Sequence, residues 1–326
     1  MNKEQLKLMQ GYDLNMKVEL TKKRLSEFVY KMGGVDNVYI AFSGGKDSTV
    51  LLHIARQLYP NIKAVFSNTG LEFPEIVDFV KSMDNVDIVT PKKSFYRVIK
   101  EDGYPMVSKK VSNAVRLAKR NIKNGDYDTF RVKQLTEGLE GSKFSMKKWG
   151  YLLDAPFNVT EKCCDYLKKE PMKTYEKHTN KKPIVATMAY ESLQREASYL
   201  KTGCNTFNVG KEMSRPMGFW TEQDVLKYIA INEIEYCSIY GKIECRMVNS
   251  NVEIGWDWEY YTTGEKRTGC IFCGFGVHLE KGENRYQRLQ KTHPKLYDYC
   301  MNKLGFKDVC NYMNIPCESE SDLNID

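Results

Sequence analysis

The stretch YIAFSGGKDSTVLLHIARQL, residues 39–58, constrains the fold more than any other part of the chain. An apolar segment over residues 37–42 predicts a β-strand, which runs into two glycines and then into a helical pattern over residues 48–59. Gly44 and Gly45 permit φ > 0 and let a ligand approach the backbone closely. The stretch therefore predicts a strand–loop–helix junction of the kind that opens an α/β fold.

Strands and helices continue to alternate along the chain. Two helical patterns cover residues 14–32 and 74–83, and the second begins with a proline at its first turn. Further apolar segments predict strands over residues 62–68, 86–91 and 182–190. Such alternation implies an α/β fold with a doubly wound parallel sheet and helices on both faces.

The alternation breaks twice, which suggests a division into parts. Residues 104–160 interrupt it with basic helical sequence, and it is lost beyond residue 200, where most of the remaining cysteines lie. We expect an N-terminal helical segment, an α/β domain with a basic helical insertion, and a small cysteine-bearing C-terminal lobe over the strand ends. Their expected ranges are 1–35, 36–200 with the insertion at about 104–160, and 201–326.

Composition points to a soluble protein. Hydrophobic residues make up 42% of the 326 and charged residues 28%, and the mean hydropathy is -0.53. No apolar run approaches the roughly 18–20 residues of a membrane helix, and the N-terminus has no apolar signal-peptide core. We therefore expect a cytoplasmic protein without a membrane partner. A disulfide framework is not expected at this size and address, so the ten cysteines point to metal ligation, redox chemistry or burial.

Positive charge is concentrated in residues 108–149. This stretch has eleven Lys and Arg against four Asp and Glu, an excess of 11 − 4 = +7 that equals the net charge of the chain. It is either a solvated helical face or a surface that faces phosphates, small or polymeric. Aromatic residues are sparse there, so the signature of single-strand stacking is weak.

The glycine loop has the chemistry of an anion site. In a doubly wound sheet, ligands bind at the carboxyl ends of the strands near a topological switch point. Free N–H groups of the loop and first helical turn would face an anion, Lys46 adds a charge, and Ser43 and Ser48 add hydroxyls. Asp47 is unusual beside phosphate unless it holds Mg²⁺ or caps the helix. The Walker and dinucleotide glycine patterns are absent, and a plain strand-to-helix turn is the alternative.

The motif SGGKDS resembles the PP-loop of the adenine-nucleotide alpha-hydrolase superfamily. Two further segments, FSNTGLEFPE (66–75) and RPMGFWTEQDVLKYI (215–229), are similar to sulfonucleotide reductases, the family that reduces PAPS and APS; in all, the resemblance spans roughly residues 35–280. It implies an adenine nucleotide (PAPS, APS or ATP) in the loop, with Thr69, Gly70 and Glu72 as substrate contacts. The implied nucleotide-binding residues are Ser43, Gly44, Gly45, Lys46, Asp47 and Ser48.

Four cysteines occur as two pairs, Cys163-Cys164 and Cys270-x-x-Cys273. Four thiolates suit Zn²⁺ or an iron–sulfur cluster. Consecutive side chains point apart, so the adjacent pair reaches two iron atoms of a cube more easily than one zinc ion. The segment CCDYLKKEPMKTY also resembles that of cluster-bearing APS reductases, which implies a [4Fe–4S] cluster on all four cysteines. Lys168 and Lys169 would lie close to it, and buried or zinc-binding cysteine is the alternative.

Two segments offer contacts for the anionic end of the substrate. MAYESLQRE (188–196) resembles the Ser…Arg segment of the family, and Arg195 could grip phosphate or sulfate as a fork beside Ser192. Lys109 in GYPMVSKK is a further candidate. A capped, solvated helix start is the alternative for the first segment.

The tail departs from the family pattern. A thiol-dependent reductase has a mobile cysteine in a Glu-Cys-Gly-x-His/Leu tail, where it attacks the sulfate sulfur and forms a thiosulfonate that a dithiol carrier such as thioredoxin cleaves. Here Cys317 is the candidate, but Glu318 follows it, and the acidic neighbours Glu318, Glu320 and Asp322 are expected to raise its pKa.

Two classes of enzyme therefore fit the sequence. One is a PAPS or APS reductase with a divergent thiol, and the other is an ATP-dependent PP-loop sulfurtransferase that adenylates and thiolates tRNA or DNA. The TGLEFPE and cysteine motifs favour the first class. The complete SGGKDS and the basic stretch 108–149, as a nucleic-acid surface, favour the second. A non-catalytic nucleotide-binding regulator is a third interpretation.

Overall fold

The computed structural model describes residues 2–138, 145–250 and 255–319. The chain forms two compact units, each assembled from separate stretches of sequence. The first unit comprises Met1–Asn68, Glu72–Thr90 and Pro171–Thr268. The second comprises Thr69–Leu71, Pro91–Glu170 and Gly269–Asp326. The units interleave along the chain, whereas the division expected from the sequence follows chain order.

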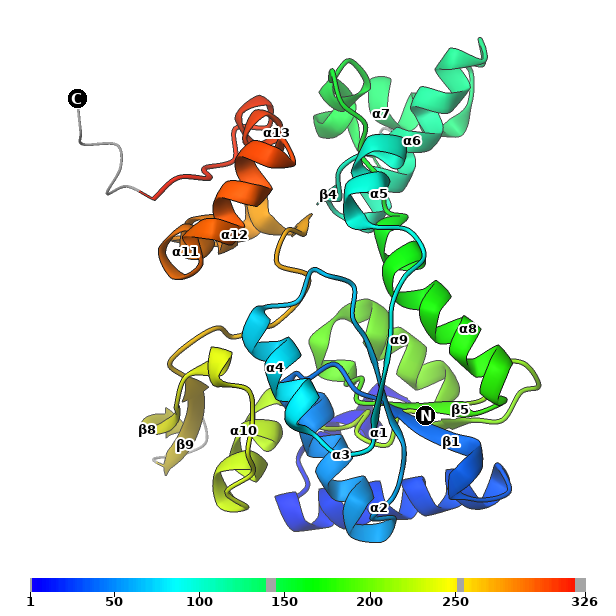
Figure 1. Ribbon diagram of the computed structural model, residues 1–326, viewed down its shortest axis with the longest axis vertical. Helices are drawn as coiled ribbons and strands as arrows, with labels where there is room; N and C mark the ends of the chain where they lie inside the picture. The colour runs from blue at the N-terminus through cyan, green and yellow to red at the C-terminus, as the bar shows by residue number, and fades with distance from the viewer. Residues whose placement is uncertain (1, 139–144, 251–254, 320–326) are drawn as a thin grey trace. The chain divides into compact units, whose positions relative to one another are not determined.

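A six-stranded sheet with the order β3-β2-β1-β5-β7-β6 forms the centre of the first unit (Figure 1). The pairings β1–β2, β2–β3, β1–β5 and β5–β7 are parallel, and β6 runs antiparallel to β7. The strands are β1 (Val38–Ala41), β2 (Ala64–Ser67), β3 (Val86–Val89), β5 (Lys182–Val185), β6 (Asn205–Thr206) and β7 (Met213–Ser214). The predicted parallel α/β sheet is confirmed.

The connections make the sheet doubly wound. The chain steps from β1 to β2 to β3 in one direction and then returns to β5 on the other side of β1. Right-handed crossovers in opposite directions place their helices on opposite faces. In β1 the consecutive residues Val38, Tyr39 and Ile40 are all buried, as expected for a strand covered on both faces. The helices of this unit are α1 (Lys3–Gln10), α2 (Leu14–Lys31), α3 (Lys46–Leu58), α4 (Pro74–Ser82), α8 (Glu170–Thr179, whose first residue lies in the second unit), α9 (Leu193–Thr202) and α10 (Glu222–Ile231).

The predicted fourth strand is shorter than expected. β5 ends at Val185, which lies opposite Ala41, the last residue of β1. On its other side, β7 offers only the pairing of Ile184 with Ser214. Since no neighbour continues beyond this point, the chain leaves the sheet, and Ala189–Glu191 form a 3₁₀ turn instead.

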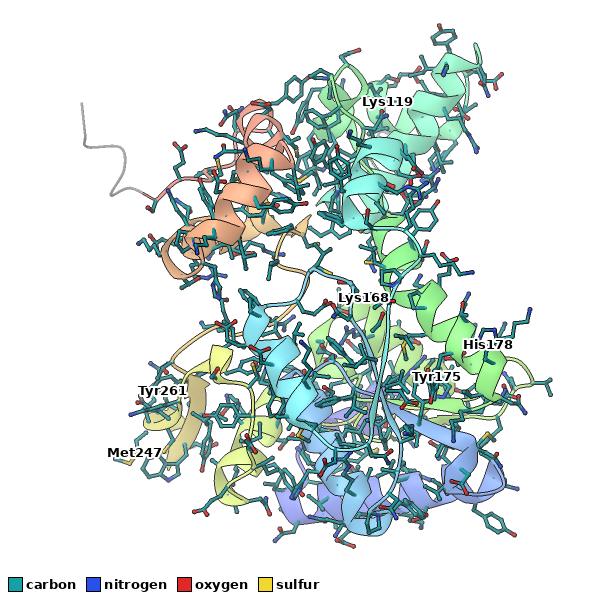
Figure 2. All side chains as sticks on the ribbon, viewed as in Figure 1. Lys119, Lys168, Tyr175, His178, Met247 and Tyr261 are labelled. Carbon is teal, nitrogen blue, oxygen red and sulfur yellow. The ribbon has the colours of Figure 1, made fainter. Side chains whose placement is uncertain are left out.

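The segment 215–229 packs inside the first unit against α2. Trp220 is fully buried, and its Nε1 donates to Thr21 Oγ1 at 2.9 Å. Asp224, in the first turn of α10, accepts from the buried Lys17 Nζ at 2.6 Å. An antiparallel hairpin of β8 (Ile243–Ser250) and β9 (Gly255–Thr262) completes the unit; Met247 and Tyr261 mark it in Figure 2.

Short helices dominate the described part of the second unit, and two of them, α6 (Lys109–Lys123) and α7 (Phe130–Thr136), lie in the range 104–160 that the sequence predicts as helical. Aromatic rings fill its core: Phe306 packs against Phe95, Tyr104 and Tyr286 at centroid distances of 6.2, 5.0 and 6.1 Å. Its helices are α5 (Phe95–Asp102), α6 (Lys109–Lys123), α7 (Phe130–Thr136), α11 (Arg285–Thr292), α12 (Pro294–Asp298) and α13 (Phe306–Tyr312). Its strands β4 (Met106–Val107) and β10 (Gly274–Phe275) pair in parallel.

Among the helices that the structure describes, none has the length and apolar character to cross a membrane.

Candidate functional site

Two candidate sites emerge, one in each unit. In the first unit, the carboxyl ends of β1 and β5 lie side by side at the point where the strand order reverses. The glycine loop leaves β1 there, and the segment that leads to α9 leaves β5. In open α/β sheets such a switch point is where ligands bind.

Close contacts surround both loop glycines. Gly44 has φ +69°, and a Cβ there would lie 2.8 Å from Val80 Cγ2 of α4. Gly45 is the N-cap of α3, and a Cβ there would meet the Tyr240 hydroxyl at 3.1 Å. The loop is therefore held between α4 on one side and Tyr240 on the other.

Hydroxyl groups hold the loop's amides. Ser43 N donates to Ser48 Oγ at 3.1 Å, Gly45 N donates to Ser43 Oγ at 3.3 Å, and Lys46 N donates to Tyr240 Oη at 3.3 Å. Gly45 provides no side-chain cap for α3. An anion at this helix start would replace neutral hydroxyl partners by charged ones, an exchange that strengthens the hydrogen bonds.

Lys46 is buried and already balanced by acceptors. Its Nζ lies 3.0 Å from Glu222 Oε1, 3.1 Å from the Lys266 carbonyl oxygen and 3.8 Å from Asp47 Oδ1. A phosphate bound by this ammonium would have to share it with Glu222.

Asp47 is the unusual group of the loop, as the sequence suggested. Its Oδ1 is buried without a hydrogen-bond partner. Burial is the main cause that raises the pKa of Asp47, while the charges of Lys46, Arg267 and Arg195 oppose the rise. One carboxylate beside a phosphate site is the protein ligand that Mg²⁺ commonly uses, so the residue fits the predicted cation.

Ser192 and Arg195 start α9 after β5, where the sequence placed them. Ser192 Oγ caps the helix by accepting from Arg195 N at 3.3 Å. The Arg195 guanidinium pairs with Glu191 one turn earlier and remains 45% exposed. It is also close enough to Asp47 for their charges to interact. The structure thus brings Arg195 and the loop together at the switch point.

Thr69, Gly70 and Glu72 follow β2, and the boundary between the units falls among them. Thr69 and Gly70 belong to the second unit, and Glu72 belongs to the first. Thr69 is buried, and its Oγ1 accepts from Leu71 N at 3.2 Å. The Leu71 carbonyl oxygen in turn accepts from Ile271 N at 2.8 Å, inside the Cys270-x-x-Cys273 motif. The segment Thr69–Leu71 is therefore a structural part of the cysteine site.

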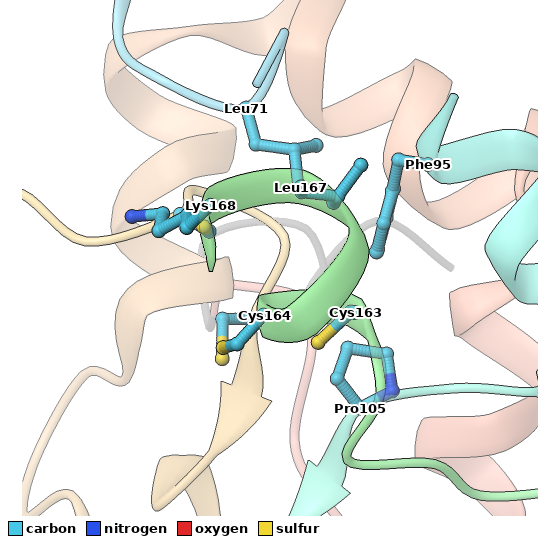
Figure 3. A pocket seen from close by; sticks show the side chains of 9 residues that line it. Leu71, Phe95, Pro105, Cys163, Cys164, Leu167 and Lys168 are labelled. Carbon is cyan, nitrogen blue, oxygen red and sulfur yellow. The ribbon is translucent and has the colours of Figure 1, made fainter. Parts of the chain in front are cut away.

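The second candidate site is a pocket in the second unit that all four predicted cysteine ligands line (Figure 3). Cys163 and Cys164 come from the segment before α8, and Cys270 and Cys273 come from a stretch more than a hundred residues later. The remaining lining residues are Leu71, Phe95, Pro105, Leu167 and Lys168. The structure confirms that the two cysteine pairs lie together.

A close approach of two backbones builds this pocket. Cys273 N donates to the Cys270 carbonyl oxygen at 3.1 Å, which closes a tight turn. The next residue, Gly274, begins β10 against β4, and a Cβ there would lie 2.2 Å from Met106 Sδ and 2.8 Å from the Pro105 carbonyl oxygen. Only glycine lets β10 come close enough to β4 to place Cys273 beside Pro105.

A helical turn presents the other pair. Cys163 and Cys164 precede a π-helical turn, Asp165–Lys169, that continues into α8. Leu167 and Lys168 lie four residues after the two cysteines and line the same pocket, as positions i and i+4 of a helix do. Lys169 instead pairs with Asp165 at 2.7 Å.

The thiols differ strongly in their electrostatics. The Cys163 thiol hydrogen-bonds to Cys164, which lowers the pKa of Cys164 to about 6; Lys109 and Lys168 also favour its thiolate. The same hydrogen bond and burial raise the pKa of Cys163. Burial raises the pKa of Cys273 to about 11. Lys109, expected at the substrate anion, thus lies beside Cys164, at the first position of α6.

The donor chemistry of the pocket fits an iron–sulfur cluster or zinc, since four thiols flanked by lysines are available. With the side chains as they stand, no three His, Cys, Asp or Glu among the described residues are gathered so that they could hold a metal ion. A bound centre would therefore require the thiols to turn toward one point.

Cys317 is buried, with 5% of its surface exposed. A hydrogen bond from Cys310 is the main cause that lowers its pKa, and Lys307 also lowers it. The expected rise was wrong because the hydrogen bond from Cys310, seven residues earlier, outweighs the effect of Glu318, which does act in the expected direction. Glu320 and Asp322 lie outside the described residues.

Sequence reasoning missed four residues around the glycine loop: Glu222, Tyr240, Arg267 and Thr268. Tyr240 Oη and Thr268 Oγ1 lie 2.6 Å apart, and the tyrosine also contacts the amide of Lys46. Arg267 lies three residues before the Cys270-x-x-Cys273 motif. A basic residue so close to a predicted ligand motif was the one local sign that it belongs to a site. Tyr240 follows no motif, and nothing in its local sequence pointed to the loop.

These features define a class: a doubly wound α/β protein whose glycine loop opens a helix at the switch point of the sheet. The model of the phosphoadenosine phosphosulfate reductase domain matches residues 37–119 and 128–274, more than half of the chain. The chain belongs to that family.

Two individual proteins are similar to this chain. A protein of Methanocaldococcus jannaschii, described as uncharacterized, is 24% identical over 296 residues, 86% of this chain. The chain spans about half (51%) of that relative's length. The crystal structure of a phosphoadenylyl-sulfate (PAPS) reductase from Candida auris, in a phosphate complex, matches with a TM-score of 0.38 and 14% identity over 73% of this chain and 90% of that one.

Proposed function

We propose that the chain is an enzyme of the sulfonucleotide reductase type that binds an adenine nucleotide, APS or PAPS, at Ser43–Ser48 and holds a [4Fe–4S] cluster on its four paired cysteines. The observation that carries the proposal is the convergence of Cys163, Cys164, Cys270 and Cys273 on one pocket in a chain of this family.

The glycine loop would bind the nucleotide's charged end. An anion at the start of α3 would replace the hydroxyls that now accept from the loop's N–H groups, and the hydroxyls of Ser43 and Ser48 can rotate toward phosphate oxygens. Arg195 would leave Glu191 and take the sulfate or terminal phosphate as a bidentate partner. Asp47 would hold Mg²⁺ if the nucleotide brings one.

The cysteine pocket would supply redox chemistry. When bound, a [4Fe–4S] cluster supplies one-electron redox chemistry at a potential that nearby charges and hydrogen bonds set. Lys109 and Lys168 stabilise thiolate at Cys164 and so would offset the negative charge of the ligands. Leu71, Phe95 and Leu167 would limit the access of water.

The state of Cys317 supports a second candidate function. Its thiol is buried and hydrogen-bonded to Cys310, whereas a sulfonucleotide reductase requires a thiol that reaches the sulfate. An ATP-dependent sulfurtransferase needs no such tail thiol. In that reaction an oxygen of the nucleic acid attacks the α-phosphorus of ATP and pyrophosphate leaves. Sulfide, delivered by a sulfur donor, then forms the new bond to the nucleic acid while the oxygen departs with AMP.

One assay separates the two functions. Protein purified without oxygen is incubated with APS or PAPS and reduced thioredoxin, or with ATP and RNA or DNA. Sulfite release in the first mixture identifies a reductase, and nucleic-acid-dependent pyrophosphate release in the second identifies a sulfurtransferase. Absence of both products, together with no binding of ATP, APS or PAPS by calorimetry, would contradict the proposal.

The metal centre is tested separately by iron analysis and absorption spectra. The anaerobically purified protein is expected to be brown and to contain iron and sulfide, and Cys270→Ala is expected to bleach it. Cys245→Ala, on the exposed hairpin strand β8, is the matched control and should keep the colour. Stoichiometric zinc without iron would refute the cluster and leave the nucleotide site untouched.

A further inference from the structure

A row of aromatic rings lies on the second unit and is assembled from segments far apart in the sequence. Tyr151 lies between Trp149 and Tyr312, at centroid distances of 6.3 and 6.0 Å, and Phe157 packs edge-on against Tyr312 at 5.4 Å. Tyr151 and Tyr312 are 38% and 39% exposed. We call these four residues the aromatic row. Because Tyr312 comes from α13, the sequence of the basic stretch alone did not reveal the row.

The aromatic row is fixed in place. Tyr312 Oη donates to the Tyr151 carbonyl oxygen at 3.2 Å, which ties α13 to the turn at residues 147–153. Trp149 packs edge-on against His278 at 5.1 Å. Rings held in this way lose little conformational entropy when a flat ligand stacks on them.

Positive charge borders the aromatic row. Lys147 and Lys148 are exposed, and Lys148 Nζ lies 5.1 Å from the centre of the Trp149 ring. On the other side, Lys119 of α6 (labelled in Figure 2) donates to the carbonyl oxygens of Ala155 and Phe157, both at 2.9 Å. These contacts bring α6 against the segment that holds Phe157.

The exposed side of α6 continues this charge. Arg116, Arg120 and Lys123 follow the spacing i, i+4, i+7 and so share one face of the helix. Arg116 is paired with Glu161, but Arg120 and Lys123 are exposed. The aromatic row therefore borders a helix that is rich in cations, with Asp154 as an acidic neighbour of Lys119.

We propose that the aromatic row and the lysines and arginines beside it bind single-stranded nucleic acid. Exposed rings with neighbouring cations are what single strands require, since bases stack on the rings and phosphates lie against the cations. A duplex keeps its base faces stacked inside and can use only the charge. The biological role of this binding rests on the second candidate function, because the bound strand would be the one that is thiolated. The binding itself needs no nucleotide.

The test measures the binding of a fluorescently labelled dT₂₀ strand and of its duplex to the full chain by anisotropy, without ATP, APS or PAPS. We expect the single strand to bind at least tenfold more tightly than the duplex. Tyr151→Ala and Tyr312→Ala should each weaken single-strand binding about 5- to 150-fold, the range that corresponds to one base–aromatic stack. Tyr312→Phe keeps the ring and should retain binding.

Further variants separate stacking from charge and from unfolding. Tyr96→Ala removes an exposed ring on α5 with a lysine over it, and should leave binding unchanged. Lys147→Ala with Lys148→Ala should reduce the slope of log affinity against log salt by about 1.4, since each phosphate contact on a single strand contributes about 0.7. Equal affinity for strand and duplex, no measurable binding, or no response to Tyr151→Ala overturns the proposal. Because no nucleotide is present, this test is independent of the reductase and sulfurtransferase assays, and its failure does not imply theirs.

Discussion

Asp47 is a residue of the glycine loop whose charge depends on pH. The pKa of Asp47 is raised in the folded state, so folding favours the protonated acid. Protonated Asp47 therefore contributes to the free energy of unfolding below the unfolded pKa of about 3.8, and this contribution is lost as pH rises through the folded pKa. At neutral pH the ionised carboxylate therefore costs stability, because its Oδ1 is buried without a hydrogen bond and Lys46 lies only at ion-pair distance, 3.8 Å.

Asp47→Asn should thus stabilise the protein near pH 7.5 and have little effect near pH 3.5. The expected gain at pH 7.5 is about 1 kcal/mol, the typical size of a single-site effect. Urea unfolding at the two pH values measures it. Asp126→Asn, at an exposed position, is the control and should change neither midpoint. A destabilised variant at pH 7.5 would show that the ionised carboxylate is held by partners.

The burial of Cys317 predicts low reactivity. Although the hydrogen bond from Cys310 lowers its pKa and favours thiolate, a reagent can reach the sulfur only when the segment opens. Iodoacetamide should label Cys317 at least about tenfold more slowly than the exposed Cys245, the factor that an opening free energy of about 1.4 kcal/mol gives. Peptide-level mass spectrometry measures both rates in one sample. Equal rates would mean that the tail thiol is accessible, as a reductase requires.

At the scale of elements, the loop between β1 and α3 depends on Gly44. Alanine there needs φ +69° and also meets Val80 of α4 at 2.8 Å. Gly125→Ala, which has φ +83° but open space around it, isolates the backbone cost of about 1–2 kcal/mol. Gly44→Ala should lower the free energy of unfolding by more than this control, as measured in urea. An equal loss would show that α4 moves aside freely.

The pairing of β4 with β10 depends on Gly274. A Cβ there overlaps Met106 Sδ and the Pro105 carbonyl oxygen, so Gly274→Ala should push β10 away and displace Cys273 from the pocket. We expect the iron content per chain to fall by more than half. Gly269→Ala, beside Cys270 but with open space around it, should keep the iron. Full iron content in Gly274→Ala would show that the cysteine site tolerates a displaced strand.

Elements that depend on local sequence could be predicted, and those that depend on neighbours could not. The first residues of α2 and α4 follow from local signals, Asp13 as the N-cap of α2 and Pro74 in the first turn of α4. The end of β5 could not be predicted, because it is set by the lengths of β1 and β7 on either side.

The same distinction holds for the candidate sites. The four cysteines were found because paired spacing is a local signal, but the role of Gly274 and the position of Lys109 beside Cys164 depend on how distant segments pack. Tyr240 could not be found for the same reason: its hydroxyl reaches the loop from 194 residues away.

At the scale of the whole molecule, the two units should differ in their dependence on the proposed metal centre. Three separate stretches of chain form the second unit, and the paired cysteines belong to two of them. If a cluster joins these stretches, its binding free energy contributes to the folding of this unit alone. The first unit has its own sheet and core, to which none of the paired cysteines belongs.

Hydrogen exchange followed by mass spectrometry tests this difference in the Cys270→Ala protein. Amides of β4 and β10 should exchange at least about tenfold faster than in the unaltered protein, while amides of β1 and β5 should keep their rates. Cys245→Ala, which alters the exposed hairpin instead, should change neither set. Faster exchange in both units would mean that they unfold together, and unchanged exchange in β4 and β10 would mean that the paired cysteines hold nothing that stabilises the fold.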